Sequence, residues 1–168
     1  MDVASTLLKA KADLHAKDDD GQTPLSTAAE NSQSDVVALL LEAKSHVDEP
    51  DARGRTPLFY GLDWVDTARL LLQAKSSVDA VNRARRTPLM FAAKRGYDAS
   101  VPLLLEAKSS VDAVGGRGRT ALPVSGRRRA GAPLCRALAC GNRTIAALLR
   151  AATNSEKGAC ALHVHGAH

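Results

Sequence analysis

The residue types that bind transition metals gather near the carboxyl end of the sequence. Cys160 opens the pattern Cys-x-x-His-x-His-x-x-His, and two further cysteines lie upstream. Thiolate and imidazole groups are ligands that zinc takes in proteins. The candidate ligands are Cys135, Cys140, Cys160, His163, His165 and His168. Their spacing matches no established zinc finger, and the tail around them has no core to hold a tetrahedron. We therefore predict neither a metal site nor a cofactor.

Catalytic motifs are absent from the sequence. It contains no nucleophile elbow of the form G-x-S-x-G, no phosphate loop of the form G-x-x-x-x-G-K and no H-E-x-x-H pattern. We therefore predict that the protein is not an enzyme. The three cysteines are odd in number and confined to the last third of the chain, which gives no disulfide framework and favours a reducing compartment.

Arginine and glycine form a second candidate site. Residues 115–119 read Gly-Gly-Arg-Gly-Arg, and residues 127–129 are all arginine. Residues 1–112 contain 14 Lys/Arg and 17 Asp/Glu, whereas residues 113–168 contain 9 and 1. Backbone amides of a glycine-rich loop can bind phosphate, and arginines bind the nucleic-acid backbone. Nucleic-acid or acidic-ligand binding by residues 115–131 is therefore one alternative function, and a flexible loop without a ligand is the simpler interpretation.

An internal repeat supplies the elements that would position any site. Thr-Pro-Leu begins at Thr23, Thr56 and Thr87, and a related Thr-Ala-Leu begins at Thr120, at steps of 33, 31 and 33 residues. A second block, Leu-Leu-x-Ala-Lys, keeps the same steps. It begins at Leu7, Leu40, Leu71 and Leu104. Two unrelated blocks with one period indicate a repeat architecture.

Each unit is predicted to be a turn followed by two short helices. In the first unit Asp20-Gly21 forms the turn, Thr23 is the N-cap and Pro24 stands in the first helical turn. Residues 31–34 interrupt the helix, and residues 35–43 form a second helix with a broad apolar face. Isolated helices below about 12 to 15 residues are marginal in water. The units must therefore stack, burying mainly Leu, Val and Ala because aromatic residues make up only 3% of the chain.

These units resemble the ankyrin repeat, with its 33-residue period and T-P-L-H-x-A signature, over roughly residues 3–122. The resemblance implies an all-α solenoid of helix-turn-helix units joined by β-hairpin-like loops. It also implies a non-catalytic protein-protein interaction module that binds a partner in a concave groove. A fragment of a larger multidomain ankyrin protein is a further alternative. The expected organisation is a half-repeat cap at 1–17, three repeats at 18–114, a basic insertion at 115–131, a degenerate repeat at 132–152 and a flexible tail at 153–168.

Several residues depart from the family pattern. The glycine that usually follows the second helix is replaced by Lys11, Lys44, Lys75 and Lys108. A residue other than glycine in the left-handed region costs on the order of 1 to 2 kcal/mol, so we expect a lower stability than that of an idealised array.

Two further departures predict weak joints. The second unit is two residues short and carries Gly61 where the first carries Ala28, so the turn near Asp63 and Trp64 should be distorted. In the third unit Pro102 should kink or shorten the second helix.

Charges mapped through the repeat suggest a binding surface. The loop that precedes each first helix is acidic in unit one, at residues 18–20, and basic in unit three. Our hypothesis is a groove with a lengthwise charge gradient that selects a partner segment acidic over units three and four. The alternative is neutral drift of solvated surface charge. The candidate partner-binding residues are Arg53, Arg55, Phe59, Trp64, Arg83, Arg85, Arg86, Met90, Lys94 and Arg95.

Trp64 has two interpretations, since it either fills the gap left by the missing residues or serves as an exposed anchor for a partner. No apolar run approaches the roughly 18 to 20 residues that span a bilayer, and the first residues are too polar for a secretory signal. We expect a monomer in the cytoplasm or nucleus, with a protein partner and no membrane.

Overall fold

The computed structural model describes residues 12–111, 113–115, 119–120, 147–149 and 151–152. Several predictions fall outside these ranges: Lys11 and most of the cap, nearly all of the basic insertion, the start of the degenerate repeat, the tail and the cysteine and histidine cluster. The proposed division into segments stays a prediction.

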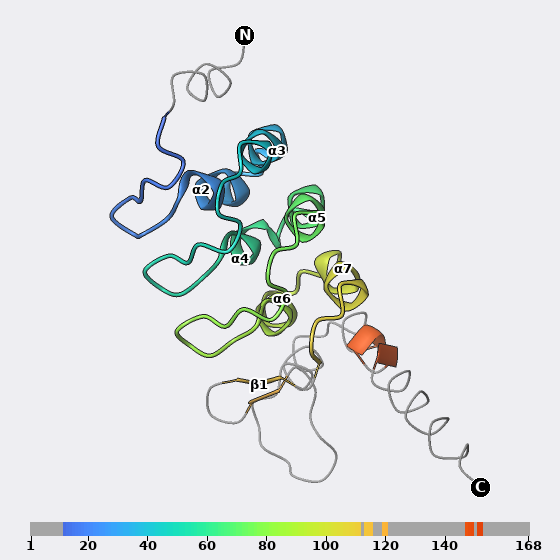
Figure 1. Cartoon of the computed structure of the whole chain (residues 1–168). Helices are drawn as coiled ribbons and strands as arrows, with labels where there is room; N and C mark the ends of the chain where they lie inside the picture. The colour runs from blue at the N-terminus through green and yellow to red at the C-terminus, as the bar shows by residue number, and fades with distance from the viewer. Residues whose placement is uncertain (1–11, 112, 116–118, 121–146, 150, 153–168) are drawn as a thin grey trace, which may run out of the picture.

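Between residues 12 and 111 the chain forms three stacked helix pairs (Figure 1). The inner helices α2, α4 and α6 lie beside three protruding loops, and the outer helices α3, α5 and α7 lie on the other side. The bounds are α2 Pro24–Glu30, α3 Ser34–Glu42, α4 Pro57–Gly61, α5 Val65–Gln73, α6 Pro88–Arg95 and α7 Ser100–Glu106. A short antiparallel pair follows, with β1 Val114–Gly115 and β2 Arg119–Thr120. The predicted all-α solenoid is confirmed.

The Thr-Pro-Leu block starts each inner helix. Thr23 and Thr87 cap their helices, with each hydroxyl accepting a backbone N–H three residues on at 3.3 Å. Thr56 occupies the same position, but its side chain makes no capping bond. The next position tolerates proline, because a backbone N–H in the first helical turn would have no acceptor within the helix. The leucine that follows is fully buried in the three units that the structure describes, at Leu25, Leu58 and Leu89.

The Leu-Leu-x-Ala-Lys block ends each outer helix. Its first leucine is buried in the core at Leu40, Leu71 and Leu104. Its lysine adopts a left-handed conformation, with φ of 63° at Lys44, 62° at Lys75 and 60° at Lys108. In each case the lysine N–H and the next residue's N–H donate back to the last turn, as in a Schellman motif. The predicted left-handed lysines are therefore confirmed at these three positions.

The loops before the inner helices, which we call fingers, have one shared backbone geometry. Finger one is residues 18–22, finger two is 51–55 and finger three is 82–86, and in each the first N–H donates to the last carbonyl at 3.0 to 3.1 Å. Neighbouring fingers are joined by one backbone bond, from Ala52 to Asp20 at 3.0 Å and from Arg83 to Arg53 at 2.9 Å. The finger row is therefore a continuous, hydrogen-bonded edge of the stack.

Aspartates at the end of the lysine block join successive repeats. Asp48 Oδ1 accepts the backbone N–H of Ser77 at 2.8 Å, and Asp79 Oδ1 accepts that of Ser110 at 2.9 Å. Ser109 Oγ also donates to Asp79 at 3.2 Å. The recurrence of Val-Asp in this block thus has a structural cause, since each aspartate satisfies a donor of the following repeat.

Both predicted weak joints alter their helices. Helix α4 is shorter than α2 and α6, and its turn into α5 has no left-handed residue, whereas Ser32 and Gly96 supply one in the neighbouring repeats. A Cβ on Gly61 would lie 2.9 Å from a Thr67 methyl carbon, so glycine lets α5 pack closely against α4. Helix α7 begins at Ser100, two residues later than its counterparts relative to the lysine block. The proline at 102 therefore falls in its first turn, where it is tolerated, and the helix is shortened.

Replacing Lys75 with glycine should stabilise the protein. Glycine removes the strain of a positive φ but adds backbone freedom to the unfolded chain, so we expect a net gain of about 0.5 to 1 kcal/mol in the free energy of unfolding. Urea denaturation measures it. Lys94→Gly within α6 is the control, because there glycine should instead cost about 1 kcal/mol. An unchanged or lowered stability of the Lys75 variant would contradict the strain argument.

Candidate functional site

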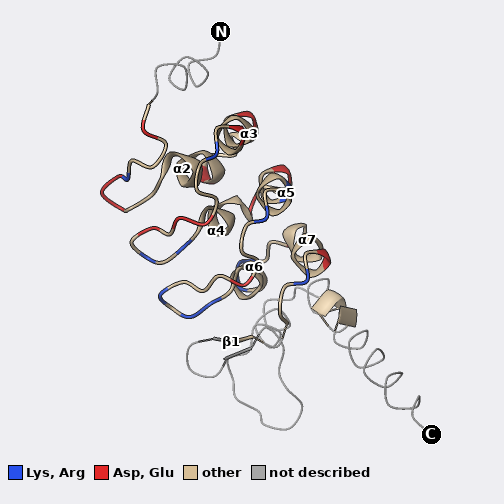
Figure 2. Ribbon diagram, viewed as in Figure 1, with Lys and Arg blue, Asp and Glu red and all other residues tan. Residues whose placement is uncertain are grey.

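The fingers carry charges whose sign changes along the row (Figure 2). Asp18, Asp19 and Asp20 are all exposed on finger one. Finger two mixes both signs, and its Arg53 lies 3.7 Å from Asp20 of the finger before it. Finger three carries three arginines and no acid. The charge gradient expected from the sequence therefore lies along one edge of the stack over these three fingers.

Arg55 is held inside finger two rather than presented on it. Its Nε and Nη2 each lie 3.0 Å from Asp51 Oδ2. The Tyr60 hydroxyl donates to the same carboxylate oxygen at 2.6 Å and accepts from Arg55, whose guanidinium lies 4.3 Å from the Tyr60 ring centroid. The Arg55 side chain is 17% exposed and the Asp51 side chain is fully buried. We call these three residues the finger-two triad.

The triad shifts the ionisation of its members. Burial raises the pKa of Asp51, but hydrogen bonds from Tyr60 and from the N–H groups of Arg55 and Arg53 outweigh it, and the net pKa is lowered. Burial and the hydrogen bond to Asp51 raise the pKa of Tyr60. Asp51 is therefore an anion and Tyr60 a neutral donor around neutral pH, which fixes Arg55 as a structural cation.

The arginines of finger three have no such partners. Arg83 and Arg85 are exposed and Arg86 is half-buried. No acid within the described part of the chain forms an ion pair with any of them, and none of their side chains donates a hydrogen bond there. Among the described residues, these three guanidinium groups on the finger row have no acidic partner.

A hollow of about 230 Å³ lies where the inner helices α4 and α6 end. Its walls are aromatic rings with two carboxylates and two guanidinium groups. The lining residues are Glu30, Arg55, Phe59, Tyr60, Asp63, Trp64, Phe91, Arg95 and Tyr97. Arg95 stands 5.4 Å from the Phe91 ring centroid and is exposed. Such a hollow can take one side chain of a partner, in contact with both aromatic rings and charged groups.

Trp64 is partly exposed and is also tied to the preceding repeat, and its contact with a partner stays a prediction. The residue is 42% exposed, and its Nε1–H donates to the Glu30 carbonyl at the end of α2, at 3.2 Å. The indole therefore joins the first and second repeats while presenting an apolar face. Burial and the nearby Asp63 carboxylate raise the pKa of Tyr97, another residue of the hollow.

Two candidates from the sequence are placed in the core. Phe59 and Met90 are each 2% exposed. They occupy the second position after the Thr-Pro pair, which the helix turns toward the neighbouring repeat, and the Phe59 ring meets Phe91 edge to face at 5.6 Å. Both side chains therefore pack in the core, Phe59 also lines the hollow, and their contact with a partner stays a prediction. Lys94 is half-buried on α6.

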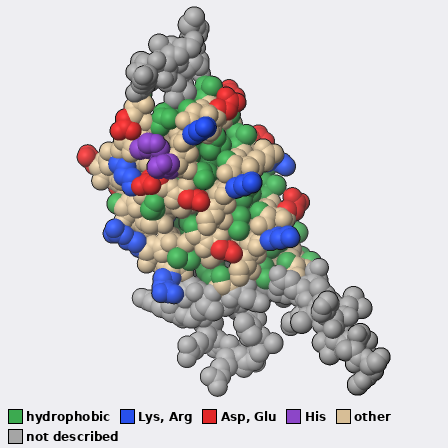
Figure 3. Space-filling model, in the orientation of Figure 1, with side chains coloured by type: hydrophobic (Ala, Val, Ile, Leu, Met, Phe, Trp, Pro, Cys, Tyr) green, Lys and Arg blue, Asp and Glu red, His purple; other side chains and the backbone are tan. Residues whose placement is uncertain are grey.

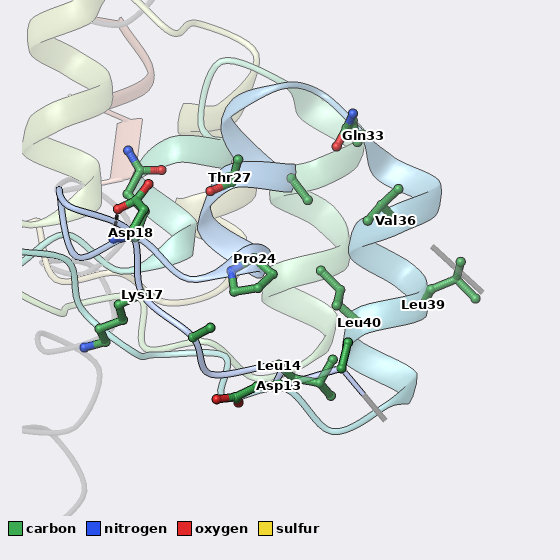
Figure 4. A pocket seen from close by; sticks show the side chains of 14 residues that line it. Asp13, Leu14, Lys17, Asp18, Pro24, Thr27, Gln33, Val36, Leu39 and Leu40 are labelled. Carbon is green, nitrogen blue, oxygen red and sulfur yellow. Dashed lines mark hydrogen bonds between the residues drawn. The ribbon is translucent and has the colours of Figure 1, made fainter. Parts of the chain in front are cut away.

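Two features lie away from the hollow. The first is a groove of about 540 Å³ between the segment that precedes finger one and the helices α2 and α3 (Figure 4), with apolar side chains from Leu14, Pro24, Val36 and Leu40. The second is a surface pair of histidine rings, from residues 15 and 46, whose centroids are 4.0 Å apart (Figure 3). Within the described residues, no three His, Cys, Asp or Glu side chains are grouped to hold a metal ion.

Comparison with known families decides the classification. Residues 1–82 match the family description "Ankyrin repeats (3 copies)", and residues 85–115 match "Ankyrin repeat". The chain belongs to the ankyrin repeat family. A search of curated proteins found no match. Ankyrin repeats are generally protein-protein interaction modules and are typically not enzymes. None of the helices within the described ranges has the length and apolar character needed to cross a membrane.

Inspection of the sequence missed several residues of this ankyrin surface. Tyr60, Glu30 and Tyr97 were not candidates, although the first two interact with Arg55 or Trp64. One signal was present for Tyr60, which aligns with Thr27 and Phe91, so that the set Asp51, Arg55 and Tyr60 does not recur in the first or third repeat. A variable set at aligned positions indicates residues that the shared scaffold does not require.

Replacing Asp51 with asparagine should lower the free energy of unfolding at neutral pH and make that free energy depend less on pH in the acidic range. The Asp51 pKa is lowered by folding, so the ionised group stabilises the fold above its unfolded pKa of about 3.9 and loses this contribution as pH falls. We expect a loss of about 2 kcal/mol at pH 7 and a shallower decline below about pH 4.

Chemical denaturation at a series of pH values measures both effects. Asp19→Asn on finger one removes the same charge from an exposed position and is the control. Equal pH profiles for the Asp51 variant and the native protein would contradict the assignment of the triad.

Proposed function

We propose that this ankyrin array is a non-catalytic binding module that holds a partner protein along its finger row and in the hollow at Trp64. The observation that carries the proposal is the hollow itself. It is a recess walled by aromatic rings, it lies beside the exposed Arg95, and its half-exposed tryptophan is hydrogen-bonded in place. Rigid aromatic residues in such recesses dominate the energy of protein interfaces.

The stack supports this role by holding the surface in a single arrangement. Trp64 is fixed at Glu30, and the turn that carries it is tied down by Ser100 Oγ, which donates to the Leu62 carbonyl at 2.6 Å. A surface that is already ordered loses little conformational entropy on binding. The array therefore suits recognition of an extended segment that spans repeats. We expect it to act as a monomer in the cytoplasm or nucleus.

A displayed library of random peptides, selected against the full chain, tests the proposal. Peptides that bind the hollow should lose affinity about ten- to a hundredfold with Trp64→Ala, as expected for an interface hot spot. Isothermal titration calorimetry measures the dissociation constant. Arg69→Ala on the exposed side of α5 is the control and should leave it unchanged.

Trp64→Ala also removes the bond to Glu30, so its thermal unfolding is measured in parallel. Trp64→Phe keeps an apolar ring without the N–H donor and should restore part of the affinity. A failure to select any peptide, or selected peptides that bind the alanine variant as tightly as the native chain, would rule out the hollow as the binding site.

A further inference from the structure

The first residue of each finger has the same backbone role in all three repeats, but it is an aspartate in fingers one and two and an uncharged asparagine in finger three. Asp18, Asp51 and Asn82 each accept, through a side-chain oxygen, the N–H of the residue four positions on, at 2.8, 2.7 and 3.1 Å. An amide oxygen therefore replaces a carboxylate oxygen in the third finger without altering the loop. The replacement removes one negative charge from the inside of that finger.

The consequence falls on Arg86, which aligns with Arg55. In the finger-two triad, a carboxylate and a phenol hold the Arg55 guanidinium. The aligned positions in the third repeat are Asn82 and Phe91, which offer the Arg86 side chain neither a carboxylate nor a hydroxyl. In finger two the Arg55 guanidinium is neutralised by the triad. The aligned Arg86 guanidinium in finger three therefore keeps its N–H donors for an external acceptor.

Arg85 adds a second, independent observation. Its φ is 52°, and the aligned residues in the other two fingers are Gly21 and Gly54, with φ of 77° and 71°. A side chain other than glycine is strained in this region, and strained backbone concentrates at functional positions. Finger three thus carries a strained arginine where the scaffold elsewhere takes glycine.

The surroundings favour an acidic ligand of limited length. The neighbouring finger two presents Arg53 toward Asp20 of finger one. Finger two therefore offers no exposed carboxylate that could pair with the arginines of finger three. The three exposed aspartates of finger one would repel a polyanion that ran along the whole row. Finger three has no aromatic residue between its arginines on which a nucleic-acid base could stack.

We propose that Arg83, Arg85 and Arg86 bind an acidic peptide segment of the partner, and that the aspartate-to-asparagine difference at position 82 makes Arg86 available for it. This inference rests on the proposed function and specifies the chemistry of one part of the surface. It also sets an orientation, because the acidic segment lies over the third repeat and away from the aspartates of the first (Figure 2).

The test is a titration of the full chain with a synthetic glutamate decapeptide at low salt, followed by NMR of backbone amides and arginine Nε groups. We expect shifts at finger three and none at finger one. Asn82→Asp supplies the carboxylate that finger two has, and should weaken binding about threefold, as expected for one exposed ion pair. Adding Phe91→Tyr, which completes a copy of the triad, should weaken it further.

Matched controls separate local from general effects. Arg69→Ala on α5 changes the net charge by the same single unit as Asn82→Asp and should leave the dissociation constant unchanged. Reversal of Arg83, Arg85 and Arg86 to glutamate should abolish binding. Thermal unfolding of every variant is measured to check that the fold persists. We expect Asn82→Asp to fold, because aspartate occupies the same position in fingers one and two.

The proposal is overturned if Asn82→Asp and the charge reversal bind the glutamate peptide as the native chain does. It is also overturned if a single-stranded uridine decamer binds more tightly with the same dependence on these variants, since the surface would then recognise nucleic acid. If the selected peptides lose affinity with Trp64→Ala but not with reversal of the finger-three arginines, this inference is wrong while the proposed function stands. A failure to select any library peptide would count against the binding module itself.

Discussion

The structure depends on burial of leucine between repeats whose helices are too short to persist alone. The helices between residues 24 and 106 are each five to nine residues long, well below the length at which an isolated helix is stable in water. The buried leucines of both repeated blocks therefore hold each helix only while the next repeat covers it. The fingers and the hollow therefore form only when the repeats are stacked.

The same constraint explains why the repeat tolerates local strain. Lysines at the ends of the outer helices and Arg85 in finger three adopt positive φ values. The backbone bonds that close each outer helix and each finger leave no other conformation at these positions. Strain of this kind is affordable where neighbouring elements already determine the chain path. The strained residue in finger three differs from the lysines, because it lies on the surface that we assign to binding.

Function then follows from what the scaffold leaves unspecified. The first residue of a finger must accept a hydrogen bond, and aspartate or asparagine does so equally well. The choice between them has little effect on the loop, yet it decides whether an arginine is neutralised internally or presented outward. Repeats of one fold can in this way differ in charge and in ligand without differing in shape.

The sequence by itself determined the helix pairs, their order and the left-handed lysines, because periodic leucines and the Thr-Pro pair report directly on local structure. It also indicated the change of sign along the fingers and the disturbed joint at Trp64. Only the tertiary structure decided that Phe59 and Met90 are buried, that Arg55 belongs to the triad, and that Trp64 bonds to the preceding repeat. Periodicity shows that a position faces a neighbour, but which atoms it meets depends on a residue some 30 positions away, and that partner is known only once the repeats are stacked.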